Sequence, residues 1–175
     1  MQHINLQELK SNAITTFEIF IQKLRSVDEA VFNTIPFKNS WTVGQVAEHV
    51  LKFQSGVVRA FSNKKAAPNR AFDQYASIIK NMFLDFDTKM KSPEFVWPGN
   101  ELIDKHSLNN KLENIAQKIL NLIENEDLKL LCKGFMFPSI GELTGFELIN
   151  FVIYHTQRHI AQLENIIAHL KNKMQ

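Results

Sequence analysis

The sequence predicts an all-α protein: a four-helix bundle with a short extra helix and a long irregular connection. Three observations support this fold class. Apolar residues recur at steps of three and four over several long segments, Pro and Gly lie between those segments, and two helix starts carry capping boxes. At 175 residues, the chain can bury most of its apolar surface without disulfides or a structural metal. We therefore expect a single domain over residues 1–175, in which any metal serves function.

The first long helix is predicted over residues 5–25, where apolar side chains follow helical spacing. A shorter helical piece over residues 27–33 follows. It ends before Pro36, because the residue that precedes a proline disfavours the helical backbone region. The next helix is predicted to start after Thr42 as N-cap, with Gln45 completing a capping box, and to run to about residue 62.

One stripe of this second long helix carries a histidine among apolar residues. At about 100° per residue, His49 falls on the same stripe as Gly56 and Ala60, so its imidazole is expected to point inward. Glycine inside a helix costs roughly 1 kcal/mol relative to alanine. We therefore expect Gly56 and Ala60 to let a neighbouring helix approach closely.

The middle of the chain alternates between polar connections and helices. Residues 64–70 read as a polar linker, and residues 71–90 carry aromatic and aliphatic side chains at the spacing of a third helix. Residues 91–106 are too rich in Pro and Gly for a helix and form the longest irregular connection, in which Trp97 either overhangs a pocket or packs against the bundle. Another amphipathic helix is predicted over residues 107–126.

The last helix is the longest amphipathic segment. Residues 129–141 approach it, with a brief extended piece allowed at residues 135–137. Thr144 and Glu147 have the spacing of a second capping box, which predicts a helix from Gly145 to about Lys171.

The composition excludes several classes of function. The 20 Lys and Arg against 18 Asp and Glu are spread along the chain, which argues against a nucleic-acid partner. The single cysteine, Cys132, rules out an internal disulfide, fits a reducing compartment and reads as a small buried apolar residue. No segment approaches the about 18 apolar residues of a membrane helix, and the N-terminus does not read as a signal peptide. We expect a soluble, cytoplasmic protein.

Three histidines are predicted to meet in the core. His155 and His159 lie four residues apart on the inward stripe of the last helix, and the inward His49 joins them from another helix. Burying three imidazoles without a common partner would leave several polar nitrogens unpaired, whereas one divalent cation would satisfy all three. Three neutral imidazoles leave an open position, as in catalytic zinc sites, and nickel, iron or manganese also accept imidazole. The alternative is that each histidine is a hydrogen-bonded core residue.

Other polar residues have weaker claims on this site. Gln162 follows His159 by three residues on the same face, so it either orients a ligand or a metal-bound water, or bonds within its own helix. Glu48 and Tyr154 flank the histidines but project elsewhere, and no role is assigned to them. The remaining histidines are expected to be solvated or structural: His3, His106 and His169.

Three blocks of the sequence carry a family resemblance. They are Trp41-Thr42-Val43-Gly44-Gln45-Val46-Ala47-Glu48-His49, Pro138-Ser139-Ile140-Gly141-Glu142-Leu143-Thr144 and His155-Thr156-Gln157-Arg158-His159-Ile160-Ala161-Gln162. In this order and spacing they resemble the DinB/YfiT-like superfamily of bacterial four-helix-bundle metalloproteins, over about residues 5–172. The resemblance implies that His49, His155 and His159 are the metal ligands, that the pocket opens at one end of the bundle, and that the protein is a homodimer.

The same resemblance implies less about the reaction than about the fold. Relatives include thiol S-transferases, which join a low-molecular-weight thiol such as bacillithiol to an electrophile, and in them the metal would lower the pKa of the thiol. Other relatives are mycothiol-dependent isomerases and proteins regarded as metal-dependent hydrolases, which would use a metal-bound hydroxide. Hydrolysis usually needs a carboxylate base, and no acidic residue lies on the histidine stripe of either ligand helix, so the transferase is favoured. A hypothesis from a different class is a non-catalytic bundle that holds a metal or a small ligand.

Overall fold

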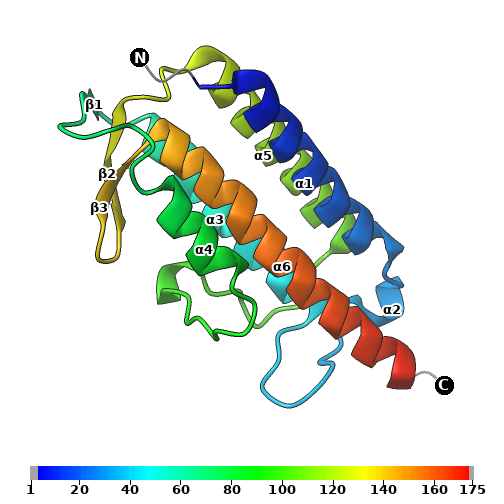
Figure 1. The fold of residues 1–175 in the computed structure, drawn as a ribbon. Coiled ribbons are helices and arrows are strands. Elements are labelled where there is room, and N and C mark those ends of the chain that lie inside the picture. Colours follow the sequence, from blue (N-terminus) through cyan, green and yellow to red (C-terminus); the bar gives the residue numbers. More distant parts are fainter. Residues whose placement is uncertain (1–3, 174–175) are drawn as a thin grey trace.

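The computed structural model describes residues 4–173, and helices dominate them. Four long helices run side by side (Figure 1), and α1 and α3 each pack against both α5 and α6. The long helices are α1 (Leu6–Ser26), α3 (Val43–Phe61), α5 (Lys105–Asn125) and α6 (Gly145–Lys173). Two shorter helices, α2 (Glu29–Phe32) and α4 (Ala76–Leu84), and one 3-10 turn, η1 (Glu94–Val96), lie in the connections. The predicted bundle with a short extra helix is confirmed.

The two predicted capping boxes start α3 and α6. The Thr42 hydroxyl accepts the Gln45 N–H at 3.1 Å, and the Gln45 side chain accepts the Thr42 N–H at 3.1 Å. At the other helix, Thr144 and Glu147 make the same reciprocal pair, at 3.2 and 2.9 Å. Both helices therefore begin where the sequence predicts, because the signal is local to four residues.

A small antiparallel sheet makes the all-α prediction inexact. Its strands lie in the order β1 (Lys65–Ala66), β2 (Leu131–Phe137) and β3 (Gly141–Thr144), at one end of the bundle (Figure 1). The predicted polar linker therefore contains a strand, and the extended piece expected at residues 135–137 is part of a longer one. Positive φ values at Ser139 and Gly141, 67° and 93°, make the tight turn between β2 and β3.

The third predicted helix is shorter than expected, since α4 covers only Ala76–Leu84 of residues 71–90. At its start, the Tyr75 N–H donates to the Glu147 carboxylate of α6 at 2.8 Å. At its end, the Asp85 side chain accepts the N–H groups of Asp87 and Thr88 and folds the chain into a turn. Both ends are thus fixed by contacts that replace further helical turns.

Three further expectations are corrected. The helix α5 begins at Lys105 rather than Ser107, because the Asp104 side chain caps it by accepting the Ser107 N–H at 2.6 Å. Trp97 is 49% exposed, so it does not pack into the bundle. Gly56 does not mark a close approach, since a Cβ added there would meet nothing within 4 Å.

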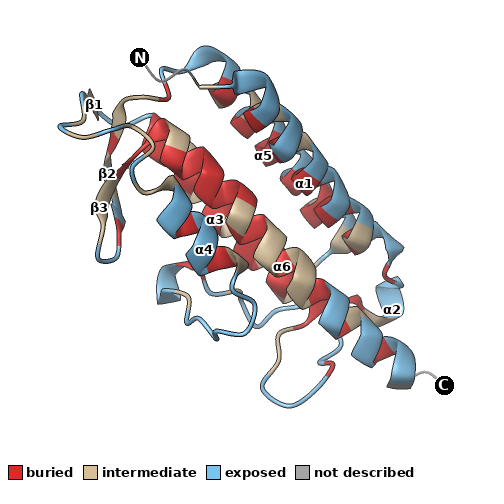
Figure 2. Ribbon diagram, in the orientation of Figure 1, coloured by how far each residue is buried: buried red, intermediate tan, exposed pale blue. Residues whose placement is uncertain are grey.

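Buried residues lie on the long helices where these face one another (Figure 2), and their apolar side chains form two clusters. In α6, residues 148–153 belong to one cluster and residues 163–170 to the other. In α3, residues 53–61 share a cluster with residues 148–153 of α6, and residues 43–50 share the other with residues 163–170. The order is reversed because the two helices run antiparallel. Three buried polar residues of α6, His155, Thr156 and His159, lie between its two apolar segments. No helix in the described part of the chain has the length and apolar character to cross a membrane.

Candidate metal centre

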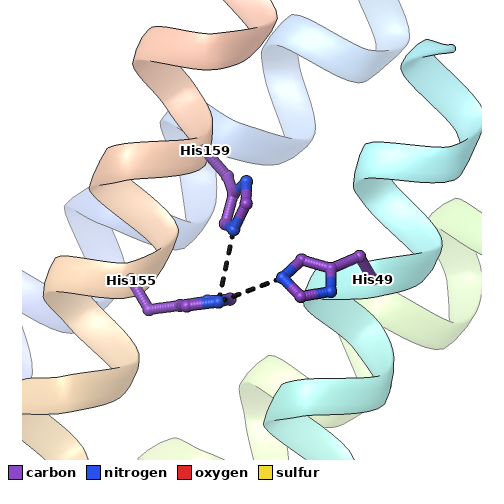
Figure 3. Close-up of side chains that lie close together, drawn as sticks. All are labelled: His49, His155 and His159. Atoms are coloured by element: carbon purple, nitrogen blue, oxygen red, sulfur yellow. Dashed lines mark hydrogen bonds between the residues drawn. The ribbon is translucent and has the colours of Figure 1, made fainter. Parts of the chain in front are cut away.

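The three predicted histidines meet at the boundary between the two apolar clusters. His49 comes from α3, and His155 and His159 come from successive turns of α6 (Figure 3). The Nε2 atom of His155 lies 3.2 Å from Nε2 of His49 and 3.2 Å from Nε2 of His159. All three rings are buried, with exposed fractions of 2, 6 and 8% in chain order. Side chains 106 residues apart in the sequence therefore point at one small volume.

Hydrogen bonds fix the tautomers of two of the rings. The Nδ1–H of His49 donates to the Val96 carbonyl oxygen at 2.9 Å, and the Nδ1–H of His159 donates to Gln162 Oε1 at 2.7 Å. A carbonyl oxygen only accepts, so both Nδ1 atoms carry the proton. Each of the two Nε2 atoms is left with a free lone pair, and both lone pairs face His155.

His155 is not satisfied by the protein alone. Its Nδ1 atom is buried without a hydrogen-bond partner, and its Nε2 atom faces two acceptors. The single N–H of neutral His155 can donate well to only one of the two neighbouring Nε2 atoms. Each buried polar atom left unpaired costs about 1–3 kcal/mol. The protein alone therefore leaves at least one nitrogen of the cluster without a hydrogen-bond partner in addition to His155 Nδ1.

A divalent cation fits this arrangement. For bonds of about 2.0–2.1 Å from nitrogen to zinc, the nitrogens of a tetrahedral site lie about 3.3–3.4 Å apart, close to the spacing of the two measured Nε2 pairs. Among the described residues, His49, His155 and His159 are the one group of three or more potential ligands whose ligand atoms lie within 4.8 Å of one another. Three protein ligands would leave a position for a further one.

Burial keeps the three imidazoles neutral, which is the form that binds metals. Desolvation lowers the pKa of His49, partly offset by its bond to Val96. Desolvation, and then the neighbouring His159 and His49, hold the pKa of His155 well below its usual value. Desolvation and the neighbouring His49 lower the pKa of His159 to about 3. At neutral pH each ring offers a lone pair instead of a positive charge.

Aromatic rings lie close to the histidines of the centre. The Phe53 ring lies 4.0 Å from the ring of His155, and those of Phe83 and Phe151 lie 5.8 and 6.0 Å away. Trp41 lies 5.1 Å from His49. This wall keeps water from the histidines and lowers the local dielectric constant, which strengthens electrostatic interactions inside.

The other residues singled out in the sequence lie elsewhere. His106 is on α5 instead of in a loop and contacts Asn110, and the ring of His169 lies tilted against that of Phe37, with 4.7 Å between the ring centroids. His3 is outside the described residues. Cys132 is fully buried in β2, as predicted, and burial raises the pKa of its thiol. Glu48 points away from the histidines, to the N–H of Gly99.

One partner of the centre had no signal in the sequence. Val96 contributes its backbone carbonyl, which any residue type would supply, so residue identity could not reveal it. Gln162 could be singled out because the three-residue spacing from His159 places both side chains on one face.

Comparisons with known proteins agree with the fold. A family model described as the DinB superfamily matches residues 15–163. The chain is 20% identical over 145 residues to the uncharacterized protein YuaE of Bacillus subtilis (strain 168), and the match covers 82% of this chain and 88% of that protein. The crystal structure of TT2238, a four-helix bundle protein, superimposes with a TM-score of 0.54 and 18% identity, covering 92% of this chain and 99% of that one.

Proposed function

The chain belongs to the DinB superfamily, and on that basis we propose that it is a metal-dependent thiol S-transferase centred on His49, His155 and His159. The observation that carries the proposal is the convergence of three Nε2 atoms, with two lone pairs aimed at the third ring. Without a cation, the lone pairs of His49 Nε2 and His159 Nε2 would have to share the single proton that His155 Nε2 can place between them.

A divalent cation bound there would supply Lewis acidity, which lowers the pKa of a thiol so that it is a thiolate at neutral pH. The chain's own residues prepare the position for it. Val96 and Gln162 hold two imidazoles in the ligating tautomer, and the phenylalanine rings limit water. In the transfer, the sulfur of the thiol forms a bond to carbon, the leaving group of the electrophile departs with its electron pair, and the thiol proton passes to water.

The donor set favours a thiol over water as the nucleophile. A hydrolase usually places a carboxylate near the attacking water as general base. The cluster of potential ligands, within the described residues, contains no Asp or Glu. A thiolate needs no such base, because its proton is lost before the attack. Cys132 is not the nucleophile, since it is buried in the sheet and its pKa is raised by burial.

The proposal is tested in two measurements on protein purified without an affinity tag. Elemental analysis should find about one divalent ion per chain, as three ligating imidazoles require. Conjugation of small thiols to chlorodinitrobenzene should be faster than in buffer. His159→Ala should lose the bound metal and the conjugation activity. His169→Ala, at an exposed position of the same helix, should keep the bound metal and the activity.

The outcomes separate the alternatives. Bound metal in the parent protein, with no conjugation for any thiol tested, would leave a metal-holding bundle and refute the transferase. A metal content far below one ion per chain would refute the metal centre, and the three histidines would then be hydrogen-bonded core residues.

A further inference from the structure

A short segment of the long connection, residues 94–99, lies along one face of α3; we name it the strap. It contains the turn η1, and its Val96 side chain is buried while Phe95 is 82% exposed. Side chains of α3 at four successive positions of one face bond to it. The bonds are Gln45 Nε2 to Gly99 O at 3.1 Å, Gly99 N to Glu48 Oε2 at 2.7 Å, His49 Nδ1 to Val96 O at 2.9 Å, and Lys52 Nζ to Trp97 O at 2.8 Å.

These four bonds differ in environment. The bond from His49 is buried, and the other three are at the surface. Glu48 and Lys52 also pair with each other at 3.3 Å, one turn apart on the helix. A charged partner makes a hydrogen bond roughly twice as strong as a neutral pair does, so these two residues are the firmest polar anchors of the strap.

The strap in turn decides what His49 offers to the centre. Only while the Val96 carbonyl stays in place is the Nδ1–H of His49 paired, with the Nε2 lone pair turned to His155. If the strap moved away, the buried Nδ1–H would lose its acceptor, and the proton would be free to exchange to Nε2. An imidazole protonated at Nε2 cannot ligate through that atom.

We propose that Glu48 and Lys52 are positioning residues for the metal centre, acting through the strap and the Val96 carbonyl on His49. The inference rests on the proposed metal-holding role of the three histidines. If the strap packed on α3 raises the affinity for the metal, then by linkage the bound metal stabilises the strap in that position by the same free energy. Neither residue belongs to the group of potential metal ligands.

The test uses a variant in which both anchors are removed without a change in net charge. Glu48→Met with Lys52→Met removes one negative and one positive charge, so the net charge of the protein is unchanged. Lys10→Met with Glu124→Met is the matched control, because it removes an exposed ion pair between α1 and α5 and leaves the strap intact. Affinity for Zn²⁺ alone is measured by competition with a chromophoric chelator.

The first pair should weaken Zn²⁺ binding about tenfold, as loss of an outer partner of a ligating histidine does. The control pair should bind as the parent does. In hydrogen exchange, the Gly99 amide should be protected by Zn²⁺ in the parent protein and less so in the first pair. Long-range proton–nitrogen NMR of metal-free protein should show His49 protonated at Nδ1 in the parent and partly at Nε2 in the first pair.

Two results would overturn the inference: unchanged Zn²⁺ affinity in the first pair, or an equal loss in the control. Failure of the proposed function looks different, since the parent protein itself would then bind no Zn²⁺. The NMR measurement needs no metal and still tests the inference in that case. If His49 has the same tautomer in the parent and in the first pair, Glu48 and Lys52 do not position it.

Discussion

Replacing Gln162 by leucine should weaken the metal centre without unfolding the protein. Gln162 is the acceptor for His159 Nδ1–H at 2.7 Å, and leucine of similar volume removes that acceptor. Metal-free His159 can move its proton to Nε2, which faces His155, but metal-bound His159 cannot. In the bound form a buried N–H left unpaired costs about 1–3 kcal/mol, and every 1.4 kcal/mol corresponds to about a factor of ten. We therefore expect Zn²⁺ affinity to fall roughly 5- to 150-fold, which brackets the about 10- to 100-fold loss typical of such partners.

The assay is a competition titration against a chelator of known affinity, with thermal unfolding of each variant alongside. Gln157→Leu is the control, since Gln157 lies on the same helix but bonds to Thr16 on α1. Gln162→Glu should bind Zn²⁺ at least as tightly as the parent, because a carboxylate is a stronger acceptor for the same N–H. Equal affinity in Gln162→Leu and the parent would refute the reasoning, and so would a large loss in Gln162→Glu.

Three further predictions concern stability. Because burial lowers the pKa of His159 to about 3 from 6.5, the unfolded chain binds a proton that the folded chain does not as pH falls through 6.5. In chelator, urea unfolding should show about 2 kcal/mol lost between about pH 7 and 5 from this group; a flat profile would contradict it. Arg70→Met leaves the fully buried Glu147 without its cation and should lower the free energy of unfolding by about 3–5 kcal/mol in the same assay. A loss below about 1 kcal/mol would contradict this prediction. Gly145→Ala sets a Cβ 3.0 Å from Leu128 Cα and should cost about 1–3 kcal/mol, seen as a lower Tm, so an unchanged Tm would show that the site relaxes.

The parts of the fold that the sequence reveals are those fixed by neighbours along the chain. Both capping boxes span four residues, and the stripe that carries His155 and His159 follows from helical periodicity alone. These features set the long helices, the inward direction of the histidines and the spacing that makes Gln162 a candidate. That they hold a metal stays a prediction.

The missed features depend on residues distant in sequence. Nothing within residues 71–90 shows that Glu147 takes the Tyr75 N–H, or that Arg158 donates to the carbonyls of Phe83 and Asp85 just where α4 ends. The strand β1 is only two residues long and forms because β2 lies beside it. Val96 acts through its backbone, so side-chain chemistry gives no signal for it.

The origin of the three histidines on two helices has a consequence for folding. An isolated α6 would already present His155 and His159 as a weak two-nitrogen chelate, whereas the third nitrogen arrives only when α3 docks. A collapsed chain with its helices formed but loosely packed would therefore bind zinc poorly. The rate of Zn²⁺ uptake during refolding would therefore report the rate at which α3 docks against α6.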